Sequence, residues 1–285
     1  MVSLETGLGV CPLFGLHLHK SDWDGDIIPL PTTASQYLIN TMLWMKKEAY
    51  EDSTIKCVAK RLAHLARYST LADPEAIKTF VADKQCSNAY KESLIEAYAI
   101  NMRSTNQTWK QLFYNRYDKL PKLPTEEKLN MMIAKAERRM ALFLSMSKDL
   151  GTRPIELTWL KVADIDLTNG VVNITGAKHT IGRTGKLKPQ TLEMLRAHIT
   201  RKNLNLTDRI FPTIPDNVCN LYRRLRNHVA EKLQDPTIRQ IRLYDFRHWR
   251  ASIEYHRTKD LLHVKNLLGH KDLRTTLRYT HSMKP

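Results

Sequence analysis

Apolar residues in the first half of the chain recur at three- and four-residue spacing, the repeat of an amphipathic helix. Between residues 35 and 119 the repeat occupies four stretches: YLINTMLWMKKEAY, STIKCVAKRLAHLARYS, DPEAIKTFVADK and SNAYKESLIEAYAINMRS. Ser53, Asp73 and Ser87 stand where helix N-caps are expected. We therefore predict a small helical domain at 35–119, preceded by a turn-rich extension at 1–34.

Two prolines among lysines, in the stretch LPKLPT, predict a short stiff linker at 120–125 and a second domain at 126–285. The second domain opens with one long helical repeat from Glu126 to Leu150. Thr125 is its expected cap, and Gly151 is suited to end it.

A hairpin is predicted where Asn169-Gly170 separates two runs of alternating apolar residues in ADIDLTNGVVNIT. The stretch RTGKLKP is a candidate third strand. Beyond Pro189 the helical repeat returns, and we expect helices at about 190–201, 216–233, 244–256, 260–268 and 272–281. The second domain is therefore predicted to be mostly helical, with one small antiparallel sheet.

The net charge of the chain indicates the class of partner that it binds. The chain has 45 Lys and Arg against 29 Asp and Glu, a formal charge of +16. Residues 1–120 carry a net charge of +1 and residues 121–285 a net charge of +15. Such an excess favours a polyanionic partner, above all nucleic acid, in the second half. Charge alone does not separate DNA from RNA or from an acidic membrane.

Other features narrow the class of protein. No run of 18 apolar residues and no secretion signal occur, so no membrane span is expected and the chain is predicted to be cytoplasmic. The four cysteines form no Cys-x-x-Cys pair. A Gly-rich phosphate loop and a paired-carboxylate metal signature are also missing, so we expect no metal and no cofactor. No aromatic-rich strand pattern supports RNA binding.

Three stretches carry the residue types of phosphate chemistry: LGTRPIEL, LYDFRHWRAS and LLGHKDLRTTLRYTH. Arginines bind two phosphate oxygens at once and never lose their charge. A tyrosine oxygen beside them can attack phosphorus, and a histidine can donate a hydrogen bond or move a proton. Singly, each has a structural explanation: Arg153 with Glu156 as a local ion pair, His270 as a cap, Tyr279 as a core aromatic.

The joint order of these stretches resembles the tyrosine recombinase (phage integrase) family. The family signature is a first arginine, a hairpin lysine, an H-x-x-R box, a Gly-His pair and a terminal tyrosine. The resemblance is strong over about 121–285 and weak over 35–119. It implies a mainly α (α+β) fold, with an N-terminal helical core-binding (SAM-like) domain and a mostly helical catalytic domain.

The resemblance also implies roles for residues. Tyr279 would be the nucleophile that forms a 3′-phosphotyrosyl bond, while Arg153 and Arg247 bind the nonbridging oxygens. Lys178 would protonate the leaving 5′ oxygen. The remaining implied roles are phosphate or proton support by His270, orientation of the site by Glu156, DNA binding by Arg183 in the hairpin, and DNA binding in the first domain by Lys56, Lys60 and Arg61. Lys186 and Lys188 are fallback candidates for the acid.

One position departs from the family pattern, because Tyr244 stands where most members have the histidine of H-x-x-R. A phenol can donate a hydrogen bond to a phosphate, but with a pKa near ~10 it is a poor base at neutral pH. Asp245 or His248 could compensate, although His248 could instead pack in the core. Some integrases of archaeal plasmids and viruses resemble this Y-x-x-R form.

The function implied is that of a site-specific DNA recombinase or integrase of a mobile element, which needs no ATP. Its partner would be double-stranded DNA, bound by a homotetramer, with a monomer possible when free and a nucleoid-associated location. The alternatives are a chromosome-dimer resolvase of the Xer kind and a DNA-binding relative that has lost catalysis. A relaxing topoisomerase is disfavoured, because such enzymes lack this motif layout.

Overall fold

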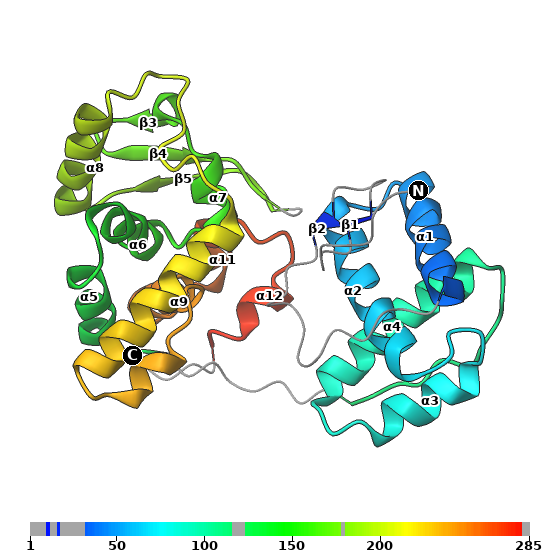
Figure 1. The fold of residues 1–285 in the computed structure, drawn as a ribbon. Helices are drawn as coiled ribbons and strands as arrows, with labels where there is room; N and C mark the ends of the chain where they lie inside the picture. The colour runs from blue at the N-terminus through cyan, green and yellow to red at the C-terminus, as the bar shows by residue number, and fades with distance from the viewer. Residues whose placement is uncertain (1–9, 12–15, 18–31, 116–122, 178–179, 281–285) are drawn as a thin grey trace. The chain divides into compact units, whose positions relative to one another are not determined.

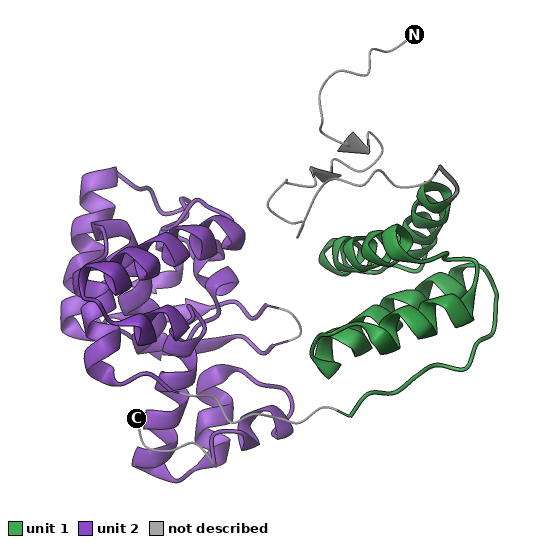
Figure 2. Ribbon diagram, turned by 60° about the horizontal axis from the view of Figure 1, so that its bottom comes forward, with its two compact units in different colours: residues 1–118 green, residues 119–285 purple. Residues whose placement is uncertain are grey.

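The computed structural model describes residues 10–11, 16–17, 32–115, 123–177 and 180–280. The chain divides into two compact units, residues 1–118 and 119–285 (Figure 2). The division lies beside the two prolines of the expected linker. Each unit has a hydrophobic core of its own.

The described residues of the first unit form four helices and a short antiparallel strand pair (Figure 1). The helices are α1 (Thr32–Lys47), α2 (Asp52–Tyr68), α3 (Pro74–Asp83) and α4 (Asn88–Ser104). The two-residue strands β1 (Val10–Cys11) and β2 (Leu16–His17) lie in the extension, where no strand is predicted. Leu62, Leu94 and Tyr98 are fully buried between the helices, and the Tyr98 hydroxyl donates to the Leu71 carbonyl at 2.9 Å.

Two of the three predicted N-caps, Asp73 and Ser87, are confirmed. The Asp73 carboxylate accepts from the Glu75 amide at 2.9 Å, and the Ser87 hydroxyl accepts from the Tyr90 amide at 3.3 Å. The prediction that Ser53 is a cap is wrong. Helix α2 begins at Asp52 with Glu51 at its N-cap, so Ser53 lies inside the first turn.

The second unit opens with two helices, α5 (Glu126–Ala134) and α6 (Arg138–Leu150), where the sequence predicts one. Glu137 adopts an extended conformation (ψ 152°), which interrupts the helical hydrogen bonds. Because the break contains neither glycine nor proline, the sequence gives no sign of it. Helix α6 is buried over its last ten residues, which makes it the central helix of this unit.

The predicted three-stranded sheet is confirmed. Strands β3 (Ile165–Asp166), β4 (Val171–Ile174) and β5 (Arg183–Lys186) pair antiparallel in the order β3-β4-β5. Gly170 adopts a positive φ of 69° at the turn between β3 and β4, a conformation that favours glycine. A short helix, α7 (Pro154–Trp159), and the 3-10 turn η2 (Val162–Asp164) connect α6 to the sheet.

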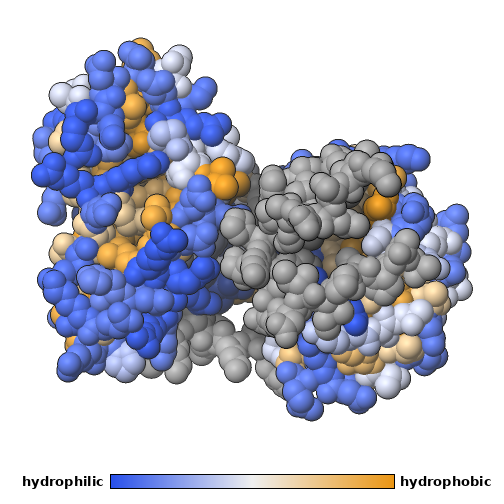
Figure 3. All heavy atoms as spheres, viewed as in Figure 1, coloured by the Kyte–Doolittle hydropathy of each residue, from blue (hydrophilic) through white to orange (hydrophobic). Residues whose placement is uncertain are grey.

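Helices complete the second unit: α8 (Pro189–Lys202), α9 (Pro215–Lys232), α10 (Asp245–Thr258), α11 (Leu261–Leu268) and α12 (Arg274–Leu277), with the 3-10 turn η3 (Pro236–Gln240). The first four agree with their predicted ranges within about two residues. The last is shorter than the predicted 272–281. The mainly helical fold with one small antiparallel sheet is therefore confirmed. On the face seen in Figure 3, the coloured residues are largely hydrophilic, with hydrophobic residues in separate patches.

We expect Asp73→Ala to lower the free energy of unfolding of the first unit by about 1 kcal/mol, because two amides at the start of α3 lose their acceptor. Ser53→Ala is the matched control, and should change it by less than about 0.5 kcal/mol, since Ser53 is exposed and caps nothing. Urea unfolding of both variants measures the difference. Equal losses would contradict the observed start of α2.

Candidate active site

The end of α6 positions the first arginine of the site. Gly151 follows the helix in the left-handed conformation (φ 59°), which turns the chain sharply. Pro154 then occupies the first helical position of α7, so Arg153 is held at the N-cap. The tight turn between the two helices therefore fixes where the Arg153 backbone lies.

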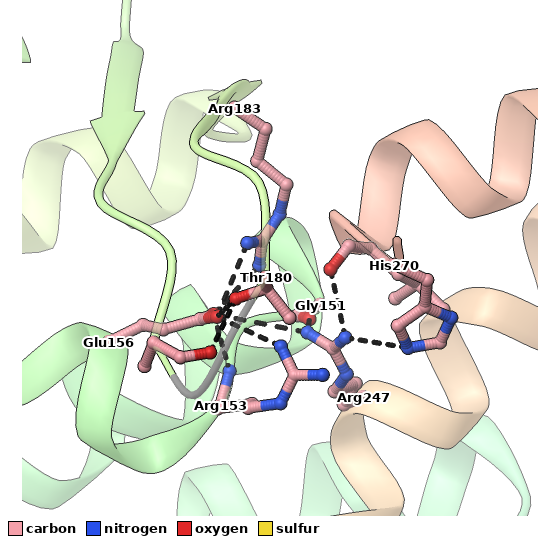
Figure 4. A network of polar contacts seen from close by, with 9 residues as sticks. Gly151, Arg153, Glu156, Thr180, Arg183, Arg247 and His270 are labelled. Carbon is pink, nitrogen blue, oxygen red and sulfur yellow. Dashed lines mark hydrogen bonds and ion pairs between the residues drawn. The ribbon is translucent and has the colours of Figure 1, made fainter. Parts of the chain in front are cut away.

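The Glu156 carboxylate is the centre of a polar network (Figure 4). It accepts from the Arg153 backbone amide at 2.9 Å and from Arg153 Nη1 at 3.0 Å. Arg183 donates to both of its oxygens, at 2.8 and 3.4 Å. Arg247 Nη1 lies 3.9 Å away, and the Thr180 hydroxyl is 3.5 Å from Oε1. One fully buried side chain thus joins α7, the strand β5 and the helix α10.

The charges of this network favour an anion. Burial raises the pKa of Glu156, but the hydrogen bond and charge of Arg183, with the Arg153 amide and the Arg247 charge, outweigh it and hold that pKa below its ordinary value. Glu156 is therefore ionised. Three guanidinium groups around one carboxylate leave two positive charges uncompensated, an arrangement suited to a phosphate.

Arg247 is anchored from α10 by carbonyl groups of two other segments. Its Nη1 donates to the Gly151 carbonyl at 2.6 Å, and its Nη2 donates to the Leu268 carbonyl at 2.9 Å. Burial, with the neighbouring charges of Arg153 and Arg183, lowers the pKa of Arg247 to about 10. Arg247 is therefore still a cation at neutral pH.

His270 follows α11 and contacts Arg247. Its Nε2 lies 3.0 Å from Arg247 Nη2, and its Nδ1 lies 2.9 Å from the Thr276 hydroxyl. Burial and the surrounding arginines lower the pKa of His270 to about 3, so the ring is neutral. Because arginine only donates, Nε2 is the acceptor and the Nδ1 proton points to Thr276. In this structure His270 therefore positions Arg247.

Gly269 joins the turn before His270 to the hairpin. Its carbonyl accepts from the Ile181 amide at 3.0 Å, and its φ is 68°. A Cβ atom here would lie 2.6 Å from the Ile181 carbonyl oxygen. The glycine of the Gly-His pair is thus required by conformation and by space.

Tyr279 lies just beyond α12, and only 2% of its surface is exposed. It packs in a small cluster with Ala251, Val264 and Leu268. Its hydroxyl is 2.9 Å from His248 Nδ1. Burial raises the pKa of Tyr279, and the charges of Arg247, Arg278 and Arg153 oppose that shift. The predicted nucleophile therefore lies within the field of the arginine cluster, and its hydroxyl is held by a histidine.

The residues near Arg247 on α10, which are Tyr244, Asp245 and His248, lie in three different environments. Tyr244 is 43% exposed at the N-terminus of α10. Asp245 is buried, and its carboxylate accepts from the Arg242 amide at 2.7 Å and from the Arg242 guanidinium at 3.1 Å. Both Asp245 contacts are thus to Arg242, just before the helix, so the geometry does not give Asp245 the compensating role considered above. His248 contacts Tyr279 instead of serving only as core packing.

Lys178 lies outside the described residues. The chain on both sides of it is described: the Thr180 amide donates to the Ala177 carbonyl at 3.2 Å, and the Thr180 hydroxyl approaches Glu156. Lys186 is exposed and pairs with Val171, three residues along β5 from Arg183. Lys188 is exposed at the start of α8, where its backbone amide donates to Asp149 at 3.0 Å.

The residues predicted to bind DNA differ in exposure. Lys56 and Lys60 are exposed on α2, in the first unit. Arg61 is half-buried and contacts the Cys57 carbonyl at 3.2 Å. The side chain of Arg183 is only 6% exposed and forms its ion pair with Glu156. Arg183 thus lies in this structure as an internal partner of Glu156.

Two contacting residues escape the sequence reasoning, Thr180 and Thr276. Thr276 is fully buried beside His270, and its place three residues before Tyr279 is the only signal that points to it. Within the described ranges, no group of three or more His, Cys, Asp and Glu side chains is arranged to hold a metal ion. None of the helices described is long and apolar enough to cross a membrane.

Comparison with known proteins shows the family to which the chain belongs. The model of the phage integrase family matches residues 122–285, more than half of the chain, and the chain belongs to that family. A probable integrase/recombinase of Methanocaldococcus jannaschii is 31% identical over 170 residues, 55% of this chain and 52% of that protein. Tyrosine recombinase XerA of Saccharolobus solfataricus is 31% identical over 140 residues, 49% of this chain and 45% of that protein. The chain spans about half the length of these curated relatives.

Solved structures share the fold at low identity. The XerH site-specific recombinase bound to its difH substrate has a TM-score of 0.64 and 22% identity, covering 88% of this chain and 81% of that one. A lambda integrase dimer bound to a core site has a TM-score of 0.62 and 13% identity, covering 85% of this chain and 96% of that one. The fold described above is therefore one found in recombinases.

We expect Glu156→Gln to lower the free energy of unfolding at pH 7 by about 3–5 kcal/mol, because the arginines lose their buried counter-charge. The native pKa of Glu156 is depressed, so its contribution is present above the unfolded pKa and disappears as pH falls through the native pKa. The gap between wild type and variant should therefore narrow in acid, below about pH 4.

Urea unfolding across pH measures this gap. The control is Glu231→Gln, which removes an exposed pair with Arg239 at 3.4 Å and should cost less than about 1 kcal/mol. A gap for Glu156→Gln that stays constant down to pH 3 would contradict an ionised, depressed carboxyl at the centre of the site.

Proposed function

We propose that the protein is a site-specific DNA strand transferase, a tyrosine recombinase that cleaves and rejoins DNA through a 3′-phosphotyrosyl intermediate. One observation carries the proposal: a tyrosine hydroxyl, held by a histidine, lies in the field of an arginine cluster whose charge exceeds that of its single carboxylate. The family membership supports the same chemistry.

In this proposal Arg153 and Arg247 bind the nonbridging oxygens of the scissile phosphate. Both carry a positive charge at neutral pH. Arg153 is held by the neighbouring Glu156 and Arg247 by carbonyl groups of two other segments, so little reorganisation is needed when charge builds up on phosphorus. Arg183 acts through Glu156 as a positioning residue. His270 holds the Arg247 guanidinium, and the exposed Tyr244 phenol supplies a further hydrogen bond to the phosphate.

The leaving 5′ oxygen needs a proton, and we assign this role to Lys178. Two observations support Lys178 over the alternatives. Thr180, two residues after Lys178, contacts the Glu156 carboxylate. The Ile181 amide donates a hydrogen bond to the carbonyl of Gly269, the residue before His270. Lys186 lies about 10 Å along β5 from Arg183, at about 3.3 Å per residue. Lys188 marks the start of α8, farther along the chain still.

The partner of the proposed reaction is double-stranded DNA. The net charge of +15 on residues 121–285 supports this, as do the exposed Lys56 and Lys60 on α2. XerH and lambda integrase, whose folds resemble this one, are bound to DNA in their structures. A homotetramer on two DNA sites, acting at the nucleoid, is the assembly proposed, with no ATP because the bond energy is kept in the phosphotyrosine.

The biological role proposed is integration or excision of a mobile element, supported by the probable integrase/recombinase among its relatives. A second role, resolution of chromosome dimers, is favoured by the likeness to XerA. The two share every chemical step at the site and differ in target DNA. A catalytically silent DNA-binding protein is disfavoured, because the site retains its arginines around Glu156 and a tyrosine whose hydroxyl contacts His248.

We expect Tyr279→Phe to abolish the covalent complex and to leave DNA affinity within a few-fold, because only the attacking oxygen is removed. The measurement is a denaturing gel of protein incubated with a nicked suicide DNA carrying its binding site, without added metal. Tyr244→Phe is the matched control: it should slow the reaction but still give the shifted band. A band that survives in Tyr279→Phe would refute the nucleophile assignment.

Lys178→Ala should slow cleavage by about 10²–10⁴-fold, the usual contribution of a general acid. Lys186→Ala provides the control with the same change of charge in the same hairpin, and should retain the rate within a few-fold. Single-turnover cleavage of the suicide DNA gives both rates. If Lys186→Ala has the larger defect, the acid is not Lys178.

A further inference from the structure

Helix α10 brings a histidine to the tyrosine hydroxyl from an unexpected position. Tyr244 occupies the family's usual histidine position, and His248 follows one helical turn later on the same face. The two rings are 6.3 Å apart between centroids, and the His248 and Tyr279 rings are 5.9 Å apart. The helix that carries Arg247 to the phosphate site thus also carries an imidazole to the nucleophile.

The contact between His248 and Tyr279 has a defined direction. Nδ1 and the hydroxyl oxygen are 2.9 Å apart. Burial, followed by the positive charges of Arg278, Arg242 and Arg247, lowers the pKa of His248 to about 4. A neutral imidazole has a nitrogen lone pair, and the phenol is the stronger acid of the two, so the hydroxyl donates to Nδ1.

Other groups of this region are engaged elsewhere or are poorly suited to take the proton. The Asp245 carboxylate is bound by Arg242 on one side of the helix start. The His270 nitrogens face Arg247 and Thr276. The Tyr244 phenol is exposed, and the oxygen of a neutral phenol is a weaker base than an imidazole nitrogen. His248 therefore contacts the hydroxyl of the proposed nucleophile and, because its ring is neutral, has a nitrogen that can accept the proton.

We propose that His248 is a catalytic residue, the general base that takes the phenolic proton of Tyr279 as its oxygen attacks phosphorus. The inference rests on the proposed function. The bond from the Tyr279 oxygen to phosphorus forms while the bond from phosphorus to the 5′ oxygen breaks. The phenolic proton passes to His248 Nδ1, and the 5′ oxygen receives a proton from the general acid, assigned above to Lys178.

The low basicity of His248 is compatible with this role. The proton need not leave the free phenol, because the acidity of the phenolic oxygen rises as its bond to phosphorus forms, and transfer occurs within that step. In the rejoining step the 5′ hydroxyl attacks phosphorus, and His248 returns its proton to the departing Tyr279 oxygen. One histidine thus serves as base in cleavage and as acid in rejoining.

The test separates the two ends of the reaction by changing the leaving atom. Nicked suicide DNA is prepared with either the normal 5′ oxygen or a bridging 5′ sulfur at the scissile position. A thiolate, with an ordinary pKa near ~8.5, leaves without a proton donor. His248→Asn, whose side chain places an amide oxygen near Nδ1 without basicity, is compared with wild type, with His248→Gln as a second variant, and with Lys178→Ala.

We expect both His248 variants to cleave about 10²-fold or more slowly on both substrates, with DNA affinity and melting temperature close to those of wild type. Lys178→Ala should recover on the sulfur substrate alone. Wild-type rates in His248→Asn or His248→Gln would overturn the proposal. It would also fail if the His248 defect vanished with sulfur, since the histidine would then act on the leaving group.

Failure of the proposed function gives a different result. In that case wild-type protein bound to its target DNA forms no covalent product with either substrate, and every variant behaves alike. Wild-type cleavage with unimpaired His248 variants instead leaves the recombinase chemistry in place and removes only His248 from it.

Discussion

The buried carboxylate of Glu156 is the constraint on which the rest of the site depends. It binds the Arg153 backbone and side chain locally and reaches Arg183 in the hairpin, 27 residues away. Arg247 from α10 completes the ring at 3.9 Å. Three segments distant in sequence therefore meet at one anion. Without it, the same three guanidinium groups would repel one another in a partly desolvated site.

Burial and the positive charge around the site together set the protonation of the two histidines that contact Arg247 and Tyr279. Burial, followed by the charges of nearby arginines, lowers the pKa of His270 to about 3 and the pKa of His248 to about 4, so both rings are neutral. A neutral His270 can accept a hydrogen bond from Arg247, and a neutral His248 can accept one from Tyr279. Burial and positive charge at the candidate phosphate site thus also favour the neutral forms of the histidines that contact Arg247 and Tyr279.

Local signals in the sequence predicted much of this fold and site. Asn169-Gly170 located the hairpin, Gly151 the end of α6, and the motif order the residues that meet at Glu156 and Tyr279. What escaped depends on tertiary packing. The break between α5 and α6 at Glu137 contains no glycine or proline from which it could be predicted. The burial of Arg183 and the contact of His248 with Tyr279 arise only when distant segments pack together, whereas the pairing of Asp245 with Arg242 is local to the start of α10.

The central claim is that Tyr279 is the residue that becomes joined to DNA. Its most direct test is mass spectrometry of the trapped protein–DNA adduct after digestion with nuclease and trypsin. Cleavage after Arg278 and after Arg242 puts Tyr279 and Tyr244 in separate peptides. We expect a nucleotide mass on the peptide that begins at Tyr279. A nucleotide on the peptide containing Tyr244, the exposed tyrosine beside His248, would contradict it.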